Sequence, residues 1–173
     1  DAVRELKEAG ITKVVMMTGD SERTAAAIAK RVGVDEYYSE VLPEDKASFV
    51  EKEKELGHKV IMIGDGINDS LALSSASVGI AISDGAAIAR EIADVTISAD
   101  NLHEIVTLKR LSTALMKRIH NNYRTIIGIN GGLIALGVTG IIMPTTSALL
   151  HNMSTLTISL RSMRNLLPKE EKA

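Results

Sequence analysis

The sequence predicts an α/β fold, a Rossmann-like parallel sheet followed by a hairpin of two transmembrane helices. Short apolar runs alternate with helical patterns up to about residue 100, at the spacing of parallel βαβ units. A long helical pattern begins at Asn101, and residues 125–160 contain no Asp, Glu, Lys or Arg. We therefore expect an α/β domain over 1–100, a basic linking helix over 101–124, a membrane hairpin over 125–164 and a cytosolic tail over 165–173.

The helices and strands of the α/β domain are assigned from hydrophobic periodicity and from the residues that begin and end them. Gly10, Gly33 and Gly57 follow three of the expected helices, where glycine commonly ends a helix. Ser21 is placed to cap the second helix, and Pro43 to begin the third. We expect helices at 2–9, 22–32, 44–56, 69–76 and 86–93, strands at 13–17, 59–63, 78–82 and 94–97, and a loop at 37–42.

Composition excludes several classes of function. The formal net charge is -2 and no basic patch is interleaved with aromatic residues, so we expect no nucleic-acid partner. The chain has no cysteine, which excludes disulfides and thiolate metal sites within it. Residues 1–4 have the pattern of a helix interior, so we expect the chain to begin inside a longer protein.

Polar residues follow two of the expected strands and open one helix, and we expect them to form one site. The two loops are 18–20, Thr-Gly-Asp, and 64–69, Gly-Asp-Gly-Ile-Asn-Asp, and Lys46 lies in the helix between them. The carboxyl ends of parallel strands share one edge of a sheet, where these groups can converge. A threonine hydroxyl binds phosphoryl oxygens, a lysine offsets their charge, and paired aspartates hold Mg2+. Taken singly, each is also explained as a turn, a helix cap or a solvated lysine.

The second half of the chain is predicted to meet a lipid bilayer. Residues 101–124 place apolar side chains at helical spacing among basic ones, which suits a membrane surface. Residues 125–143 form a charge-free run of 19 residues, about 28 Å of helix. We expect a tight turn at 144–146 and a second span at 147–160, with both outer ends in the cytosol because basic residues flank them. The alternative is two buried helices of a soluble protein.

These motifs together resemble a known family. Residues 18–20, 43–46 (Pro-Glu-Asp-Lys) and 64–69 are similar to the later motifs of the haloacid dehalogenase superfamily, in the form used by P-type ATPases. Residues 77–82 and 93–95, followed by a basic helix and two apolar stretches, resemble the carboxyl-terminal end of the heavy-metal-transporting branch. The resemblance covers nearly the whole chain. It implies an ATP-driven pump in which an aspartate is phosphorylated and hydrolysed as metal crosses the membrane.

The resemblance also implies roles for individual residues. Thr18 and Lys46 would contact the phosphoryl group, and Asp65 would be the principal Mg2+ ligand. Asn68 and Asp69 would support phosphate and metal. By the same resemblance, the catalytic loop includes Gly19 and Asp20, and the cofactor-binding glycines are Gly64 and Gly66.

The chain also departs from the family. It contains no Asp-Lys-Thr-Gly-Thr phosphorylation motif and no Cys-Pro-Cys type membrane motif, and the nucleotide-binding and actuator domains are absent from it. It therefore resembles a carboxyl-terminal fragment, or one piece of a split protein, that holds part of the phosphorylation domain. By itself we expect it to be inactive, with ATP bound mainly by the rest of the pump.

Four polar residues in the predicted spans are candidate ligands of the transported ion. Asn130 lies in the first span, and His151, Ser154 and Thr155 share one helix face in the second. Ser, Thr and Asn in membranes also serve as packing contacts between helices. Copper pumps of the family tend to carry Tyr-Asn and Met-x-x-Ser-Ser patterns, and zinc and cadmium pumps a lysine and an aspartate; this sequence matches neither. An imidazole with oxygen ligands favours Zn, Cd, Co or Mn over Cu+.

Three functions therefore stay open at this point. The leading one is ATP-driven export of a heavy-metal cation through an aspartyl phosphate, by an integral protein of the plasma membrane whose α/β domain is cytosolic. A membrane-tethered phosphatase of the same superfamily is the alternative enzyme. A regulatory membrane fragment that binds the parent pump is the alternative without catalysis.

Overall fold

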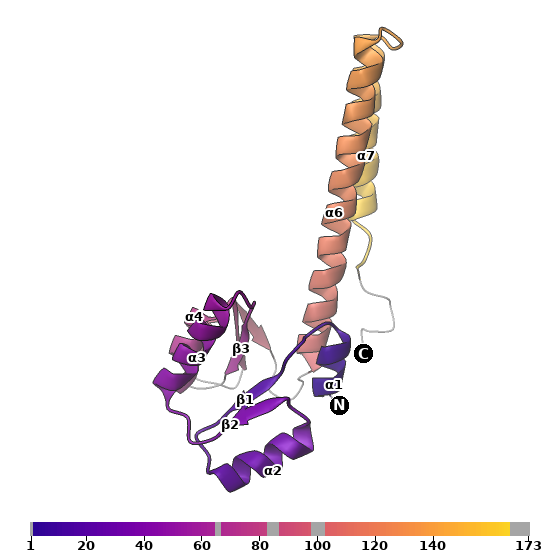
Figure 1. Ribbon diagram of the computed structural model, residues 1–173. Helices are drawn as coiled ribbons and strands as arrows, with labels where there is room; N and C mark the ends of the chain where they lie inside the picture. Colours follow the sequence, from indigo (N-terminus) through magenta and orange to yellow (C-terminus); the bar gives the residue numbers. More distant parts are fainter. Residues whose placement is uncertain (1, 65–66, 83–86, 98–102, 167–173) are drawn as a thin grey trace. The chain divides into compact units, whose positions relative to one another are not determined.

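The computed structural model describes residues 2–64, 67–82, 87–97 and 103–166. The chain divides into two compact units, Asp1–Thr107 and Leu108–Ala173. Figure 1 shows the α/β elements of the first unit and the helical hairpin of the second.

The first unit is an α/β structure with parallel strands, as predicted. Strand β1 pairs with β2, and β3 pairs with β4, which in turn pairs with β5. The strands therefore form two sheets, and the expectation of a single sheet is wrong for the described residues. The elements are α1 (Ala2–Glu8), β1 (Val15–Met17), α2 (Glu22–Val32), β2 (Glu36–Tyr38), α3 (Pro43–Glu55), β3 (Ile61–Gly64), the 3-10 turn η1 (Ile67–Asp69), α4 (Ser70–Ser75), β4 (Val78–Ile82), α5 (Ala87–Ile92) and β5 (Val95–Ile97).

The signals that end helices were predicted more reliably than the caps that begin them. Gly33 and Gly57 follow α2 and α3 with φ of +80° and +87°, a conformation that glycine adopts at little cost. Ser21 precedes α2, but its hydroxyl lies 3.2 Å from Oγ1 of Thr24 and makes no cap bond to backbone, so the predicted side-chain cap is wrong. Strand β2 occupies part of the expected loop, because its two tyrosines suit a pleated surface.

The core of the first unit is built largely from small and medium side chains. Met17 of β1 packs against the buried cluster around β3, so both sheets share this core. A Cβ at Gly79 would lie 2.7 Å from the carbonyl oxygen of Leu73, which means that β4 approaches α4 too closely for any side chain there. The buried cluster comprises Ala47, Val50, Met62, Ala72, Leu73 and Ala81.

The second unit contains most of α6 (His103–Val138) together with α7 (Pro144–Ser162). Helix α6 is continuous, so the expected linking helix and first span are one helix. Its first turns belong to the first unit, where Ile105 and Val106 are buried. The connection to α7 contains Gly140 at φ +73°, and α7 begins at Pro144. The turn predicted at 144–146 is therefore wrong, because proline is favoured in the first turn of a helix.

Across the described ranges, no helix is both long and apolar enough to cross a membrane. The prediction of two spanning helices is thus wrong for α6 and α7. Helix α6 ends at Val138, before the charge-free run is complete, and its preceding turns carry Asn121, Asn122 and Arg124. Helix α7 interrupts its apolar residues with His151, Asn152 and several hydroxyl side chains.

The close contact at Gly79 predicts that Gly79→Ala destabilises the protein by about 1–3 kcal/mol, because the new methyl group meets backbone that cannot turn away. Urea unfolding followed by circular dichroism measures this loss. Gly132→Ala is the matched control, since a Cβ at this helical position meets nothing within 4 Å. A Gly79→Ala protein as stable as the control variant would contradict the packing described here.

Candidate functional site

The first predicted loop, residues 18–20, forms a tight hydrogen-bonded turn after β1. The Thr18 hydroxyl donates to Oδ2 of Asp20 at 3.0 Å and accepts the Asp20 backbone N–H at 3.1 Å. The Thr18 backbone N–H donates to the carbonyl of Tyr38 at 3.0 Å, and the Val41 N–H donates to the carbonyl of Thr18 at 3.0 Å. Thr18 is half-buried, whereas Gly19 and Asp20 are exposed. The loop is therefore fixed in place while its tip stays open to a ligand.

A neighbouring loop after β2 supports this turn from the other side. Glu40 has φ +52°, unusual for a residue with a side chain, and its N–H donates to the carbonyl of Asp20 at 3.0 Å. The Glu22 carboxylate accepts the Ser39 hydroxyl at 2.5 Å and the Tyr37 hydroxyl at 2.7 Å. These bonds, Ser39 first and Tyr37 second, lower the pKa of Glu22. They fasten the loop to α2, a support that the sequence pattern did not reveal.

Lys46 and Asp69 form the second part of the site. The Lys46 Nζ donates to Oδ1 of Asp69 at 2.8 Å, and the two side chains are only 15% and 10% exposed. The pair joins the first turn of α3 to the end of η1. A buried carboxylate needs such a partner, because the free energy lost when the charge leaves water is larger than the free energy gained by burial alone.

Gly64 makes room for this carboxylate. A Cβ on Gly64 would lie 2.5 Å from the Cβ of Asp69, so any side chain there would displace the aspartate. Gly64 was predicted as a cofactor-binding residue; the structure places it against Asp69. This packing role was missed because the spacing of the motif does not show which residues touch.

The two parts of the site are linked through consecutive residues. The Val41 N–H donates to Thr18, and the next residue, Leu42, accepts the backbone N–H of Lys46 at 3.2 Å. The described atoms show no direct hydrogen bond between the Lys46–Asp69 pair and residues 18–20. The loop from β2 to α3 therefore sets the spacing between the turn and the ion pair.

The predicted magnesium site is described only in part. Asp65 and Gly66 lie outside the described residues, and Asn68 is exposed on η1. Within the described ranges, no three His, Cys, Asp or Glu side chains gather as metal ligands. The residues fit Mg2+ in chemistry, because carboxylate oxygens are its preferred ligands. Asp69 suits a supporting role at the Mg2+ rather than that of principal ligand, because one of its carboxylate oxygens already accepts a hydrogen bond from Lys46.

The candidate ligands of a transported ion lie within the second unit. His151 Nδ1 donates to Oδ1 of Asn130 at 2.9 Å, which joins α7 to α6. A histidine held through Nδ1 in this way binds a metal through Nε2. The hydroxyls of Ser154 and Thr155 donate to the His151 carbonyl at 2.8 and 3.0 Å. Asn130 is thus paired with His151, and the hydroxyl groups of Ser154 and Thr155 both donate within α7.

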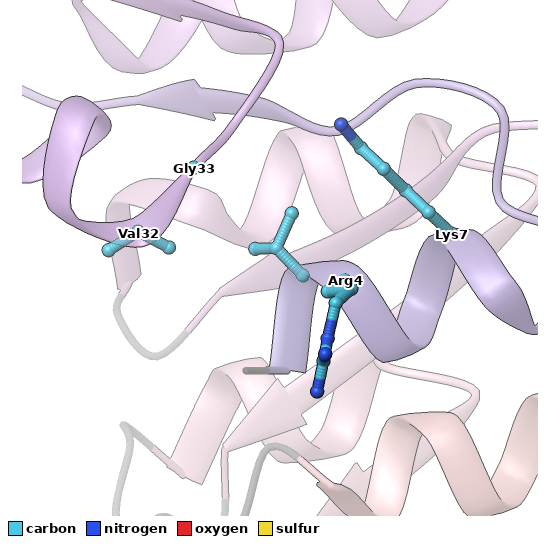
Figure 2. Close-up of a pocket in the computed structure, with 5 residues that line it drawn as sticks. Arg4, Lys7, Val32 and Gly33 are labelled. Atoms are coloured by element: carbon cyan, nitrogen blue, oxygen red, sulfur yellow. The ribbon is translucent and has the colours of Figure 1, made fainter.

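A surface hollow of the first unit lies apart from these residues. Figure 2 shows it between α1 and the end of α2, with Arg4 and Lys7 on one side and Val32 and Gly33 on the other. Lys7 donates to Asp35 at 2.6 Å, so its charge is already matched. None of the predicted site residues lines this hollow, and we assign it no role in the site.

Comparisons with known proteins agree with the motifs. Residues 1–77 match the model of the haloacid dehalogenase-like hydrolase family. The zinc-exporting P-type ATPase of Mycobacterium marinum is 36% identical over 165 residues, which is 95% of this chain and 22% of that protein. The manganese-exporting P-type ATPase of Mycobacterium tuberculosis is 37% identical over 92% of this chain and 22% of its own. The copper-exporting P-type ATPase of Bacillus subtilis is 39% identical over 94% and 20%.

A solved structure extends the likeness to the fold. The crystal structure of a zinc-transporting PIB-type ATPase in its E2.Pi state superposes with a TM-score of 0.88 and 33% identity. The match covers 96% of this chain and 27% of that one. The relatives are thus heavy-metal P-type ATPases, and this chain spans about a fifth of the length of the curated ones.

The mostly buried ion pair predicts that Lys46→Met, measured without Mg2+, destabilises the protein by about 3 kcal/mol, because Asp69 is left without its partner. Urea unfolding measures the loss. The double variant Lys46→Met with Asp69→Leu removes both charges, and we expect it to regain at least half of that stability. A Lys46→Met protein with wild-type stability would show that the pair is not formed.

Proposed function

We propose that this chain is part of a P-type ATPase that exports a heavy-metal cation through an aspartyl-phosphate intermediate. The proposal rests on the motifs at 18–20 and 64–69, on relatives that export zinc, manganese or copper, and on the likeness to a zinc-transporting pump. In the whole protein this chain supplies part of the phosphorylation domain and two carboxyl-terminal helices. The protein would lie in the plasma membrane, with the α/β unit in the cytosol beside its supply of ATP.

The observation that supports this function best is the mostly buried Lys46–Asp69 pair, whose carboxylate packs against Gly64. Asp69 holds the Lys46 ammonium in one place, where it offsets the charge of a phosphoryl group. The Thr18 hydroxyl, which donates to Asp20 in this structure, would turn to a phosphoryl oxygen beside the backbone N–H of Gly19. Mg2+, when held by Asp65 with support from Asn68 and Asp69, would neutralise further charge on the phosphate. ATP would be bound mainly by the parts of the protein outside this chain.

The acceptor aspartate is placed outside this chain, since the Asp-Lys-Thr-Gly-Thr motif does not occur in it. The arrangement of the strands supports a site completed from elsewhere. In the described residues β1 pairs only with β2, and β3 only with β4, so β1 and β3 are edge strands and each has one unpaired side. A parallel strand from the rest of the protein can add to these edges. That strand would join the Thr18 turn and the Lys46–Asp69 pair into one sheet.

Loss of the magnesium ligand tests the site. In the whole protein, Asp65→Asn is expected to lower Mg2+-dependent phosphorylation by γ-labelled ATP by about a hundredfold or more, because one charged ligand is lost. Trapping the acid-stable phosphoenzyme measures this. Asp35→Asn is the control, since Asp35 binds Lys7 and the Val14 N–H away from the site. A normal amount of phosphoenzyme in Asp65→Asn would reject Asp65 as the magnesium ligand. If the whole protein hydrolyses phosphate esters but is not phosphorylated by ATP, the alternative function of a membrane-tethered phosphatase would be favoured.

The transported cation is proposed to bind near Asn130 and His151. An imidazole beside an amide oxygen suits Zn, Cd, Co or Mn better than Cu+, which prefers sulfur. The relatives include exporters of zinc, of manganese and of copper, so their names do not select one ion. Ser154 and Thr155 keep hydroxyl lone pairs and stay candidate ligands beside His151.

The role of His151 predicts a change in metal response. His151→Ala is expected to raise the zinc concentration for half-maximal ATPase stimulation by about tenfold, since one metal ligand is lost. Assays in membrane vesicles measure this, with His120→Ala as the control because His120 is an exposed histidine of α6. Equal zinc responses in the two variants would remove His151 from the transport path.

A further inference from the structure

The end of α7 is held by a side chain of α6. The Arg118 guanidinium donates to the Ser162 carbonyl at 2.9 Å, to the Asn165 carbonyl at 3.0 Å, and to the carbonyl of Arg164. The last carbonyls of a helix have no hydrogen-bond partner within the helix. A cation at this end also interacts favourably with the negative end of the helix dipole. Arg118 therefore acts as a cap for α7, supplied from another helix.

A second bond reinforces the cap one turn further along α6. Asn122 Nδ2 donates to the Ser162 hydroxyl at 2.6 Å, and that hydroxyl donates to the Ile158 carbonyl at 2.8 Å. Arg118, Asn122 and Ser162 are all half-buried, unlike most of their neighbours. Ser162 is thus held through both its backbone and its side chain.

Apolar packing does little to fix α7 against α6. Helix α7 has no buried residue, and Leu149, Leu156 and Leu160 are 62%, 55% and 59% exposed. Apolar contacts are also non-directional, so they set the register of two helices weakly. Hydrogen bonds between α6 and α7 therefore contribute more to setting the register of the two helices.

The Arg118 cap and the Asn130–His151 bond specify the same antiparallel register. Along α6, Arg118 and Asn130 are about 18 Å apart at 1.5 Å per residue. Along α7, Ser162 and His151 are about 17 Å apart by the same rise. Because the two spacings agree, closing the cap brings His151 level with Asn130.

We infer that Arg118 is a positioning residue that sets the register of α7 and so brings His151 to Asn130. The inference rests on the proposed function, in which this pair contacts the transported cation. The Arg118 guanidinium binds carbonyls at the end of α7, about 18 Å along α6 from Asn130, so we assign Arg118 no contact with the cation. Its loss would leave the phosphorylation chemistry intact and weaken the response to metal.

Cross-linking tests the register independently of activity. The chain has no cysteine, so in the whole protein, with any cysteines outside this chain replaced, the pair Asn130→Cys and His151→Cys can be joined by a short bis-maleimide. We expect efficient cross-linking with Arg118 present and a loss of at least fivefold in rate with Arg118→Gln. Lys117→Gln removes the same charge from an exposed neighbour and should leave the rate unchanged. Equal rates in both variants would overturn the inference.

Metal response tests the consequence for function. Arg118→Gln is expected to raise the zinc concentration for half-maximal ATPase stimulation by about five- to tenfold, with phosphoenzyme at saturating zinc within about twofold of wild type. Lys117→Gln should match wild type. If Arg118→Gln does not fold, Asn122→Ala, which removes only the bond to the Ser162 side chain, should give a smaller shift in the same direction.

The outcomes separate the two claims. A wild-type protein that forms no phosphoenzyme would reject the proposed function, and the cross-linking rates would still decide the register. In a working pump, a zinc response of Arg118→Gln equal to that of Lys117→Gln would reject the inference alone. Where Arg118→Gln does not fold, the same result for Asn122→Ala would reject it.

Discussion

The ion pair between Lys46 and Asp69 is the interaction on which the first unit and its site depend. It joins α3 to η1 at 2.8 Å between side chains that are almost removed from water. Such a pair adds little net stability over apolar packing, but an unpaired Asp69 in the same place is costly. The Asp69 carboxylate therefore depends on the charge of Lys46 and on the absence of a side chain at Gly64, which leaves space for it.

The same constraint explains why the site is preorganised. In the proposed reaction Lys46 would already be fixed when a phosphoryl group arrives, so charge that develops on the phosphate would require little reorganisation. The turn at Thr18 is fixed separately, by bonds to Tyr38, Val41 and the strained Glu40. In the proposed protein, a strand that carries the acceptor would join these two half-sites at the edges of the two sheets.

Local chemistry decided which features could be predicted from sequence. Glycine at positive φ ended α2 and α3 as expected, because that signal acts over a few residues. The motifs indicated Lys46 and Asp69 as site residues, but the ion pair between them was not predicted. The bond between Asn130 and His151 and the cap by Arg118 could not be derived from spacing, because the register of two helices is set by tertiary contacts. The first membrane span was wrongly predicted from the charge-free run 125–143 for a related reason. The length of that run does not show where α6 ends.

The most direct test of the account is to locate the phosphate in the whole protein after reaction with ATP, Mg2+ and zinc. Mass spectrometry of the borohydride-reduced phosphoenzyme identifies the acceptor. We expect one modified aspartate outside residues 1–173, formed only when Lys46 and Asp65 are intact. An acceptor within these residues, or no acyl phosphate at all, would contradict this expectation.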